Sequence, residues 1–206
     1  FTQLSTPPLR QYLADVVDYY KLALSSDEPY IKYISFYHIM EYFYDEVFKK
    51  KMVSDLRNKI TSPDFTYKND DKVYEIAKFV NNRMRMDSKS GLGDEAESLK
   101  FVLMEYVPIE ELRARIATID PTAETYYQTS KVVFCNAPSI AWSDVQGVYT
   151  QLCKRIYATR NSLIHSKSGR KHELYHPYKD EPILRKEIPL VKAVAELIII
   201  NSSSVL

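Results

Sequence analysis

Apolar residues recur at helical spacing along almost the entire chain, and this periodicity restricts the fold more than any other feature. Residues three, four and seven apart share one face of an α-helix, so each apolar stripe predicts a helix with one buried side. Long stripes cover residues 9–24, 30–51, 143–165 and 181–200, and shorter ones cover 53–61, 71–86, 94–106 and 109–118. The sequence therefore predicts an all-α helical bundle, with residues 1–206 forming a single domain.

The stretch from residue 119 to 142 interrupts this pattern. Asp120-Pro121 and Asn136-Ala137-Pro138 are typical of turns, whereas Lys131-Val132-Val133-Phe134 combines β-branched and aromatic residues. We expect an irregular insert around 119–142, and a short strand within it remains open.

Composition excludes several classes of function. The chain has four glycines among 206 residues, where an average protein has about 7% glycine. It contains neither a G-x-G-x-x-G nor a G-x-x-x-x-G-K-[ST] sequence, so dinucleotide-binding and P-loop folds have no support. A net charge of +1 does not predict strong non-specific binding to nucleic acid. Any RNA-binding groove must therefore come from a local concentration of basic residues.

The cysteines and the chain ends bear on location. Cys135 and Cys153 are too few for a disulfide scaffold, and we expect two unpaired buried thiols rather than one bridge. No basic segment precedes an apolar one at Phe1, and the apolar run over 197–200 is far shorter than the ~20 residues that span a bilayer. We expect a cytoplasmic protein without a membrane anchor. Because the sequence does not begin with methionine, we expect a domain excised from a longer chain.

The helix predicted over 143–165 carries the candidate site. Ser143-Asp144 can cap its start, and a stripe through Val148 and Ile156 must face the core. Asn161 and His165 are four residues apart and share the opposite face. Arg160 and His165 are five residues apart, which corresponds to about 140° around one ideal helix. Their side chains would converge only if the helix end loosens or a second copy of the helix packs alongside.

The residue types at this helix end suit phosphodiester chemistry. Histidine gains and loses a proton near neutral pH, and arginine can donate two parallel hydrogen bonds to phosphate oxygens. We expect the surrounding basic residues to form the substrate-binding groove: Arg155, Lys167, Arg170 and Lys171.

The segment Tyr157-Ala-Thr-Arg160-Asn161-Ser-Leu-Ile-His165 resembles the R-[polar]-x-x-x-H signature of the HEPN superfamily of helical ribonucleases. The upstream segment Ser35-Phe36-Tyr37-His38-Ile39-Met40-Glu41-Tyr42 is similar to the corresponding helix of ApeA-like HEPN domains. The architecture matches over about two thirds of the chain, although the specific motif is only six residues long.

This resemblance implies a metal-independent endoribonuclease without a cofactor, acting as a homodimer in which two motif helices form one composite site. Arg160 would stabilise the phosphate, Asn161 would position it, and His165 would assist attack by the RNA 2′-hydroxyl. It also implies an effector of a toxin or anti-phage defence system, restrained by an upstream regulatory domain or an antitoxin. HEPN toxins paired with nucleotidyltransferase antitoxins carry a tyrosine two residues after the histidine. Lys167 stands there in this chain, which argues against membership of that subset.

Two further residues are expected to support the site, Glu41 and Tyr157. Glu41 either orients Arg160 or His165, or is a carboxylate satisfied by a tyrosine hydroxyl or an arginine, and both interpretations remain open.

The sequence also leaves two other functions open. One is a non-catalytic HEPN module that binds a nucleotide or a partner protein through the same surface.

The second alternative is a zinc hydrolase. His172-Glu173-Leu174-Tyr175-His176 matches the H-E-x-x-H signature, which needs both histidines on one helical face. Gly169 precedes this motif and Pro177 ends it, which favours a polar loop instead. Glu187 or Glu196 could be proposed as a third ligand, but neither stands in a recognisable ligand context. We therefore predict no metal site.

Overall fold

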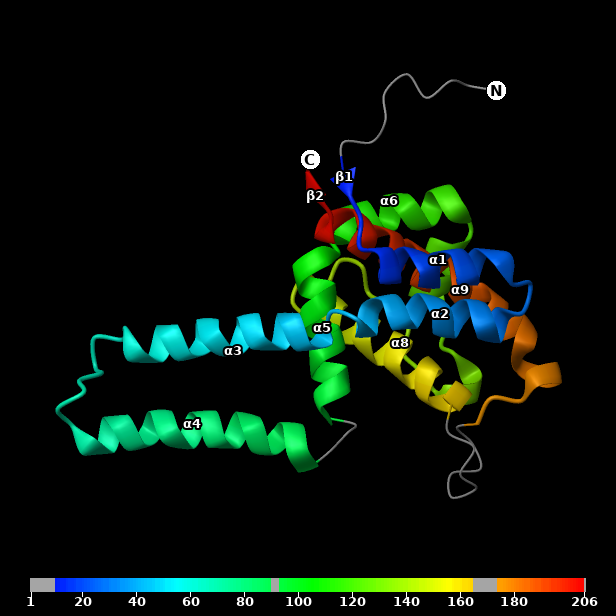
Figure 1. The fold of residues 1–206 in the computed structure, drawn as a ribbon. Helices are drawn as coiled ribbons and strands as arrows, with labels where there is room; N and C mark the ends of the chain where they lie inside the picture. Colours follow the sequence, from blue (N-terminus) through cyan, green and yellow to red (C-terminus); the bar gives the residue numbers. More distant parts are fainter. Residues whose placement is uncertain (1–9, 90–92, 165–173, 206) are drawn as a thin grey trace.

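The computed structural model describes residues 10–89, 93–164 and 174–205, and over these residues the fold is all-α. Figure 1 shows a compact body from which one pair of helices projects. In chain order the helices are α1 (Ala14–Ser25), α2 (Pro29–Glu41), α3 (Tyr44–Ile60), α4 (Asp70–Lys89), α5 (Gly93–Tyr106), α6 (Ile109–Ile119), α7 (Ala123–Thr129), α8 (Val148–Ile164) and α9 (Pro177–Ser202). Two-residue strands β1 (Arg10–Gln11) and β2 (Ser204–Val205) pair antiparallel near the ends of the chain.

Helices α2 and α9 form the centre of the body, because both are apolar on most sides. The largest buried side chains of α2 are aromatic, and those of α9 are aliphatic, with Leu190, Val191 and Val194 nearly inaccessible to solvent. A helix that is apolar all round is stable only where neighbours surround it. Accordingly, α1 packs against α2, and α6 packs against α9 (Figure 1).

The single helix expected over 30–51 is wrong, because the chain turns after Glu41. The amide of Phe43 donates to the carbonyl of Met40, three residues back, and α3 then starts at Tyr44. The turn buries two consecutive rings: Phe43 packs on Tyr106 with ring centroids 5.2 Å apart, and the Tyr44 hydroxyl donates to that of Tyr37 at 2.8 Å. With no proline or glycine at this point, the sequence pattern does not indicate the break. The second break expected near residue 52 is also wrong, since α3 is continuous there.

The start of α9 also differs from expectation. The stripe over 181–200 places the start of this helix near residue 181, but α9 begins four residues earlier, with Pro177 in its first turn and Pro182 inside the helix. The amide of His176 donates to Asp180 Oδ2 at 2.9 Å, so a carboxylate one turn along satisfies a backbone group at the helix start.

The insert over 119–142 is more regular than its sequence suggests. It holds the short helix α7 and a 3₁₀ turn, η1 (Val133–Cys135). The strand that the sequence left open does not form in this segment; its only β-type pairing is one isolated antiparallel bridge between Val132 and Ala137. Asn136, with φ of 50°, makes the tight return, a conformation that asparagine tolerates better than most residues.

In the described part of the chain, no helix is long and apolar enough to cross a membrane. Both cysteines are free and buried, as expected.

The buried thiols lead to a prediction about chemical reactivity. Burial raises the pKa of Cys135, and it raises the pKa of Cys153 to about 11. Only the thiolate reacts, so a disulfide reagent at pH 8 should modify Cys153 of the native protein ~100-fold more slowly than in guanidinium chloride. Absorbance at 412 nm after addition of Ellman's reagent measures both rates. Rapid modification of the native protein would contradict the packing described around α8.

Candidate functional site

Helix α8 carries the candidate site at its C-terminal end, and its start explains how it is placed. The helix begins at Val148 rather than at residue 143, after a turn in which Asp144 Oδ1 accepts a hydrogen bond from the Gly147 amide at 2.8 Å. A Cβ at Gly147 would collide with the Asp144 carboxylate in its observed position, so a larger residue there would require that side chain to move and would disturb this hydrogen bond. Val148, Leu152 and Ile156 face the core as predicted, and within α8 only Lys154 and Ile164 are exposed.

Arg160 lies near the C-terminal end of α8 and is held by two carboxylates from other helices. Its guanidinium donates to Glu95 Oε2 on α5 at 3.1 Å and to Glu41 Oε1 on α2 at 3.4 Å. It also donates to Oδ1 of its neighbour Asn161 at 3.1 Å. The Arg160 side chain is only 13% exposed. A long, flexible cation is thus fixed in one position at the edge of the body.

The aromatic ring of Tyr37 packs against the guanidinium of Arg160. The centroid of the Tyr37 ring lies 5.1 Å from Arg160 Cζ, a distance at which the ring attracts a cation. Burial raises the pKa values of Tyr37 and of its hydrogen-bond donor Tyr44. Both phenols are therefore neutral at physiological pH, and neither can serve as the base in a reaction at this site.

Glu41 is ionised at neutral pH. Its carboxylate lies 2.9 Å from His38 Nδ1, and this hydrogen bond lowers the pKa of Glu41, against the opposing effect of burial and with further help from Arg160. The structure thus joins the two interpretations of Glu41: an arginine satisfies the carboxylate, and the carboxylate holds that arginine in place.

Tyr157 stands one turn before Asn161 on the same face of α8. Its hydroxyl donates to Glu95 Oε2 at 3.4 Å, so Tyr157 and Arg160 share one carboxylate. Burial raises the pKa of Tyr157, and a hydrogen bond with Asn161 opposes that shift. We name Arg160, Asn161, Glu41, Glu95 and Tyr157 together the Arg160 cluster.

Glu95 is the member of the cluster that the sequence does not reveal. It lies in the first turn of α5, where an acidic residue is common because it complements the positive end of the helix dipole. The helix dipole alone therefore accounts for an acidic residue at this position, and the local sequence does not indicate that Glu95 also binds Arg160. Only the packing of α5 against α8 brings its carboxylate to Arg160.

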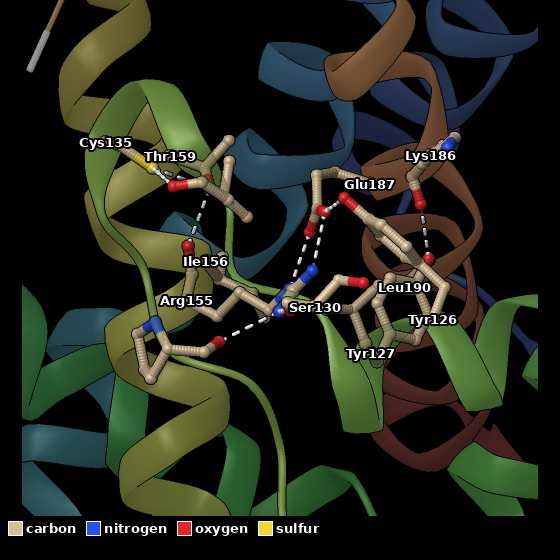
Figure 2. A network of polar contacts seen from close by, with 12 residues as sticks. Tyr126, Tyr127, Ser130, Cys135, Arg155, Ile156, Thr159, Lys186, Glu187 and Leu190 are labelled. Carbon is tan, nitrogen blue, oxygen red and sulfur yellow. Dashed lines mark hydrogen bonds and ion pairs between the residues drawn. The ribbon is translucent and has the colours of Figure 1, made fainter.

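The expectation that Arg155 belongs to a substrate-binding groove is wrong. The side chain is fully buried, and its guanidinium forms a two-pronged ion pair with Glu187 of α9, both contacts at 2.8 Å (Figure 2). Its remaining contacts go to the carbonyls of Ser130 and Pro138 at 2.7 and 2.8 Å. Burial alone would lower the pKa of Arg155, but the pairing with Glu187 raises it.

Helical spacing alone is enough to place Arg155 on the core-facing side of α8. It lies three residues after Leu152 and seven after Val148, both on the core-facing stripe of α8. Its partner lies 32 residues away on α9, where nothing in the local sequence marks it. The pair joins α8, α9 and the insert, with the rings of Tyr126 and Tyr127 packed around the guanidinium (Figure 2).

Several predicted site residues lie outside the described part of the chain: His165, Lys167, Arg170, Lys171, His172 and Glu173. Of the zinc motif's two histidines, His176 is described and is exposed. The two glutamates weighed as third ligands are both engaged elsewhere, Glu187 with Arg155 and Glu196 with Arg115 and the Tyr20 hydroxyl. Among the described residues no group of three or more metal-ligating side chains converges.

No family model, curated protein or solved structure matches this chain.

Proposed function

We propose that this chain is a metal-independent endoribonuclease of the HEPN type, acting at the end of α8 with Arg160, Asn161 and His165. The observation that supports it most is the fixed guanidinium of Arg160, which lies beside Asn161 and is five residues before His165 in the sequence. A cation oriented in advance stabilises developing negative charge without the cost of reorganising its surroundings. As a homodimer, two such helix ends would supply the guanidinium and the imidazole from different copies.

The proposed reaction uses the RNA's own 2′-hydroxyl. His165 accepts the proton of the 2′-hydroxyl as its oxygen bonds to phosphorus, and the bond from phosphorus to the 5′-oxygen breaks. The leaving 5′-oxygen takes up a proton from water or from a second imidazolium. Arg160 donates to the phosphate oxygens while their charge increases, and Asn161 positions them. The products are a 2′,3′-cyclic phosphate and a 5′-hydroxyl.

The two carboxylates set a condition on this reaction. One positive charge on Arg160 faces two negative charges, on Glu41 and Glu95, at 3.1–3.4 Å. A guanidinium has five N–H groups. A phosphate can therefore accept hydrogen bonds from Arg160 only if it shares these donors with Glu41 and Glu95 or displaces one of the two carboxylates. Glu41 and Glu95 therefore keep Arg160 in place before the substrate binds and compete with it afterwards.

The same contacts favour a second candidate, a non-catalytic module that binds a nucleotide or a partner protein. In that case the Arg160 cluster only joins α2, α5 and α8. Binding of nucleotide without cleavage of any RNA would favour this candidate. A role as the effector of a toxin or anti-phage defence system rests on the motif resemblance and belongs to the first candidate.

An experiment with two histidine variants tests the nuclease proposal. The purified chain should cleave RNA in the presence of EDTA, and His165→Ala should slow cleavage by ~10²–10⁴-fold, the usual contribution of a positioned acid or base. His176→Ala is the matched control, because this exposed histidine contributes a backbone amide to the start of α9, which the substitution leaves intact. Gel analysis of a labelled RNA gives the rates. Loss of cleavage in EDTA, or full activity of His165→Ala, would contradict the proposal.

A further inference from the structure

His38, on α2, contacts the Arg160 cluster without being one of its members. Its Nδ1 lies 2.9 Å from Oε2 of Glu41, whereas the other oxygen of that carboxylate lies 3.4 Å from the guanidinium of Arg160. The Glu41 carboxylate therefore stands between an imidazole and a guanidinium, with one oxygen toward each. Glu95, the second carboxylate on Arg160, is closer to the guanidinium, at 3.1 Å. Of the two carboxylates, Glu41 is thus the one that Arg160 holds less closely.

The contact with Glu41 determines which nitrogen of His38 gains or loses a proton. An ionised carboxylate only accepts hydrogen bonds, so Nδ1 carries a proton and donates to Glu41 whether the ring is neutral or charged. The proton that histidine gains or loses between about pH 5 and 8 is then the one on Nε2. The ring of Tyr19 on α1 packs on the imidazole, with centroids 5.1 Å apart, and the His38 side chain is 41% exposed. The imidazole is therefore held in one orientation and is still accessible to water.

The charge of His38 changes the electrostatic balance of the site. Arg160 carries one positive charge against the negative charges of Glu41 and Glu95, which leaves one net negative charge while His38 is neutral. Protonation of His38 cancels that charge. A phosphate is itself negative, so the four groups oppose its approach in the first state and do not oppose it in the second.

Among the described side chains around Glu41, His38 is of the type that changes charge near neutral pH. The hydrogen bond from His38 lowers the pKa of Glu41, so this carboxylate stays ionised there. The helices packed against α2 contribute residue types that ordinarily keep their charge between about pH 6 and 8. They include Asp15 and Asp18 of α1, which line one surface hollow with Tyr19, Glu95 of α5, Arg160 of α8, and Glu187 and Glu196 of α9, which pair with Arg155 and Arg115.

We propose that His38 is a positioning residue for phosphate binding at Arg160: when a phosphate of RNA arrives, Glu41 is the carboxylate that yields, and His38 holds it away from the guanidinium. The inference rests on the proposed function, because it takes Arg160 to be the phosphate-binding group. Glu95 stays in place and keeps Arg160 oriented. A protonated His38 holds Glu41 more strongly, since an ion pair adds Coulomb attraction to the hydrogen bond. The site therefore accepts phosphate more readily when His38 is charged.

The affinity for RNA at two pH values tests this role without requiring cleavage. A His165→Ala background removes the other imidazole of the proposed site, and a short labelled 2′-O-methyl RNA has no 2′-hydroxyl to attack. Fluorescence anisotropy at constant ionic strength should show an affinity ~3–5-fold lower at pH 8 than at pH 6, the effect of one partly exposed charge pair. His38→Asn in this background should bind at both pH values as its parent does at pH 8. Its amide can donate to Glu41 in place of Nδ1 but cannot gain a proton.

A double-mutant cycle in the same background shows whether His38 acts through Glu41. At pH 6, His38→Ala should weaken RNA binding ~3–5-fold, because Glu41 is then free to compete for Arg160. Glu41→Gln should strengthen binding, and adding His38→Ala to it should have no further effect. Equal losses with and without Glu41→Gln would mean that His38 contacts RNA directly or only supports the fold, and would overturn the inference. Circular dichroism checks that each variant is folded.

Lys72→Ala is the matched control. Lys72 and Glu75 on α4 form the same type of pair, a cation and a carboxylate three residues apart, but neither belongs to the Arg160 cluster. Binding should change less than about twofold, and a loss as large as that of His38→Ala would overturn the specific role of His38.

The inference and the proposed function can fail separately. A chain that cleaves RNA but shows no coupling between His38 and Glu41 would overturn the inference alone. A chain that shows this coupling in RNA binding but never cleaves RNA would support the inference and contradict the nuclease function. An affinity for RNA that none of the variants changes, or no binding at all, would overturn the inference.

Discussion

Replacing Glu187 with glutamine is expected to lower the free energy of unfolding by about 3–5 kcal/mol, the usual cost of removing one partner from a buried ion pair. Glu187 is 1% exposed and Arg155 is fully buried. The variant would leave the Arg155 guanidinium with a neutral partner in a site without water access, between the rings of Tyr126 and Tyr127 (Figure 2). Chemical denaturation followed by circular dichroism measures this loss.

Helix α9 provides a matched control for this prediction. Glu181 and Arg185 form the same type of pair at the surface, where solvent screens the charges, so Glu181→Gln should cost no more than about 1 kcal/mol. A double variant, Arg155→Met/Glu187→Leu, should recover much of the stability lost in Glu187→Gln, because it removes the unpaired charge. Equal effects of Glu187→Gln and Glu181→Gln would contradict the account of Arg155 as a core residue.

Replacing Arg160 with alanine is expected to slow RNA cleavage by ~10²–10³-fold, as removal of one oriented donor to a developing charge does in other enzymes. Arg160→Lys should restore little of this activity. An ammonium has no planar fork, and it cannot hold Glu41, Glu95 and the amide of Asn161 in the geometry observed. Cleavage rates under saturating RNA, with circular dichroism to check folding, measure the effect.

The control for Arg160 is Arg115→Ala. Arg115 also pairs with a glutamate of another helix, Glu196 at 2.9 Å, but on α6 and away from the Arg160 cluster. Its loss should leave the cleavage rate within about threefold of the parent, since a partly exposed ion pair remote from the site contributes to local stability rather than to the reaction. A fall in rate as large for Arg115→Ala as for Arg160→Ala would mean that the effect is structural rather than catalytic.

The sequence predicts the helices best where they are amphipathic and bounded by strong signals. Residues 94–106 and 109–118 were expected as helices and agree with α5 and α6 to within a residue, because Pro108 separates them. The turn between α2 and α3 could not be expected in the same way. It depends on Phe43 packing against Tyr106, a contact between residues far apart in the chain.

The residues of the candidate site also fall into two groups, those that the local sequence identifies and those that only tertiary packing identifies. Arg160 and Asn161 could be selected from local spacing, and the structure places them near the C-terminal end of α8. Arg155 shares the basic character of that segment, yet it belongs to the core, and only its phase on the helix distinguishes it from Arg160. Glu95 and Glu187 could not be identified, because each acquires its role from a helix remote in sequence.

The chemistry at the ends of cleaved RNA tests the central proposal most directly. Attack by the 2′-hydroxyl at a site formed by Arg160 and His165 leaves a 2′,3′-cyclic phosphate on one fragment and a 5′-hydroxyl on the other. Mass spectrometry of a short synthetic RNA after digestion in EDTA should therefore show cyclic phosphate ends, and an RNA with a 2′-deoxynucleotide at the cleavage position should remain intact. Fragments with 5′-phosphate and 3′-hydroxyl ends, or cleavage of the deoxy-substituted RNA, would contradict it.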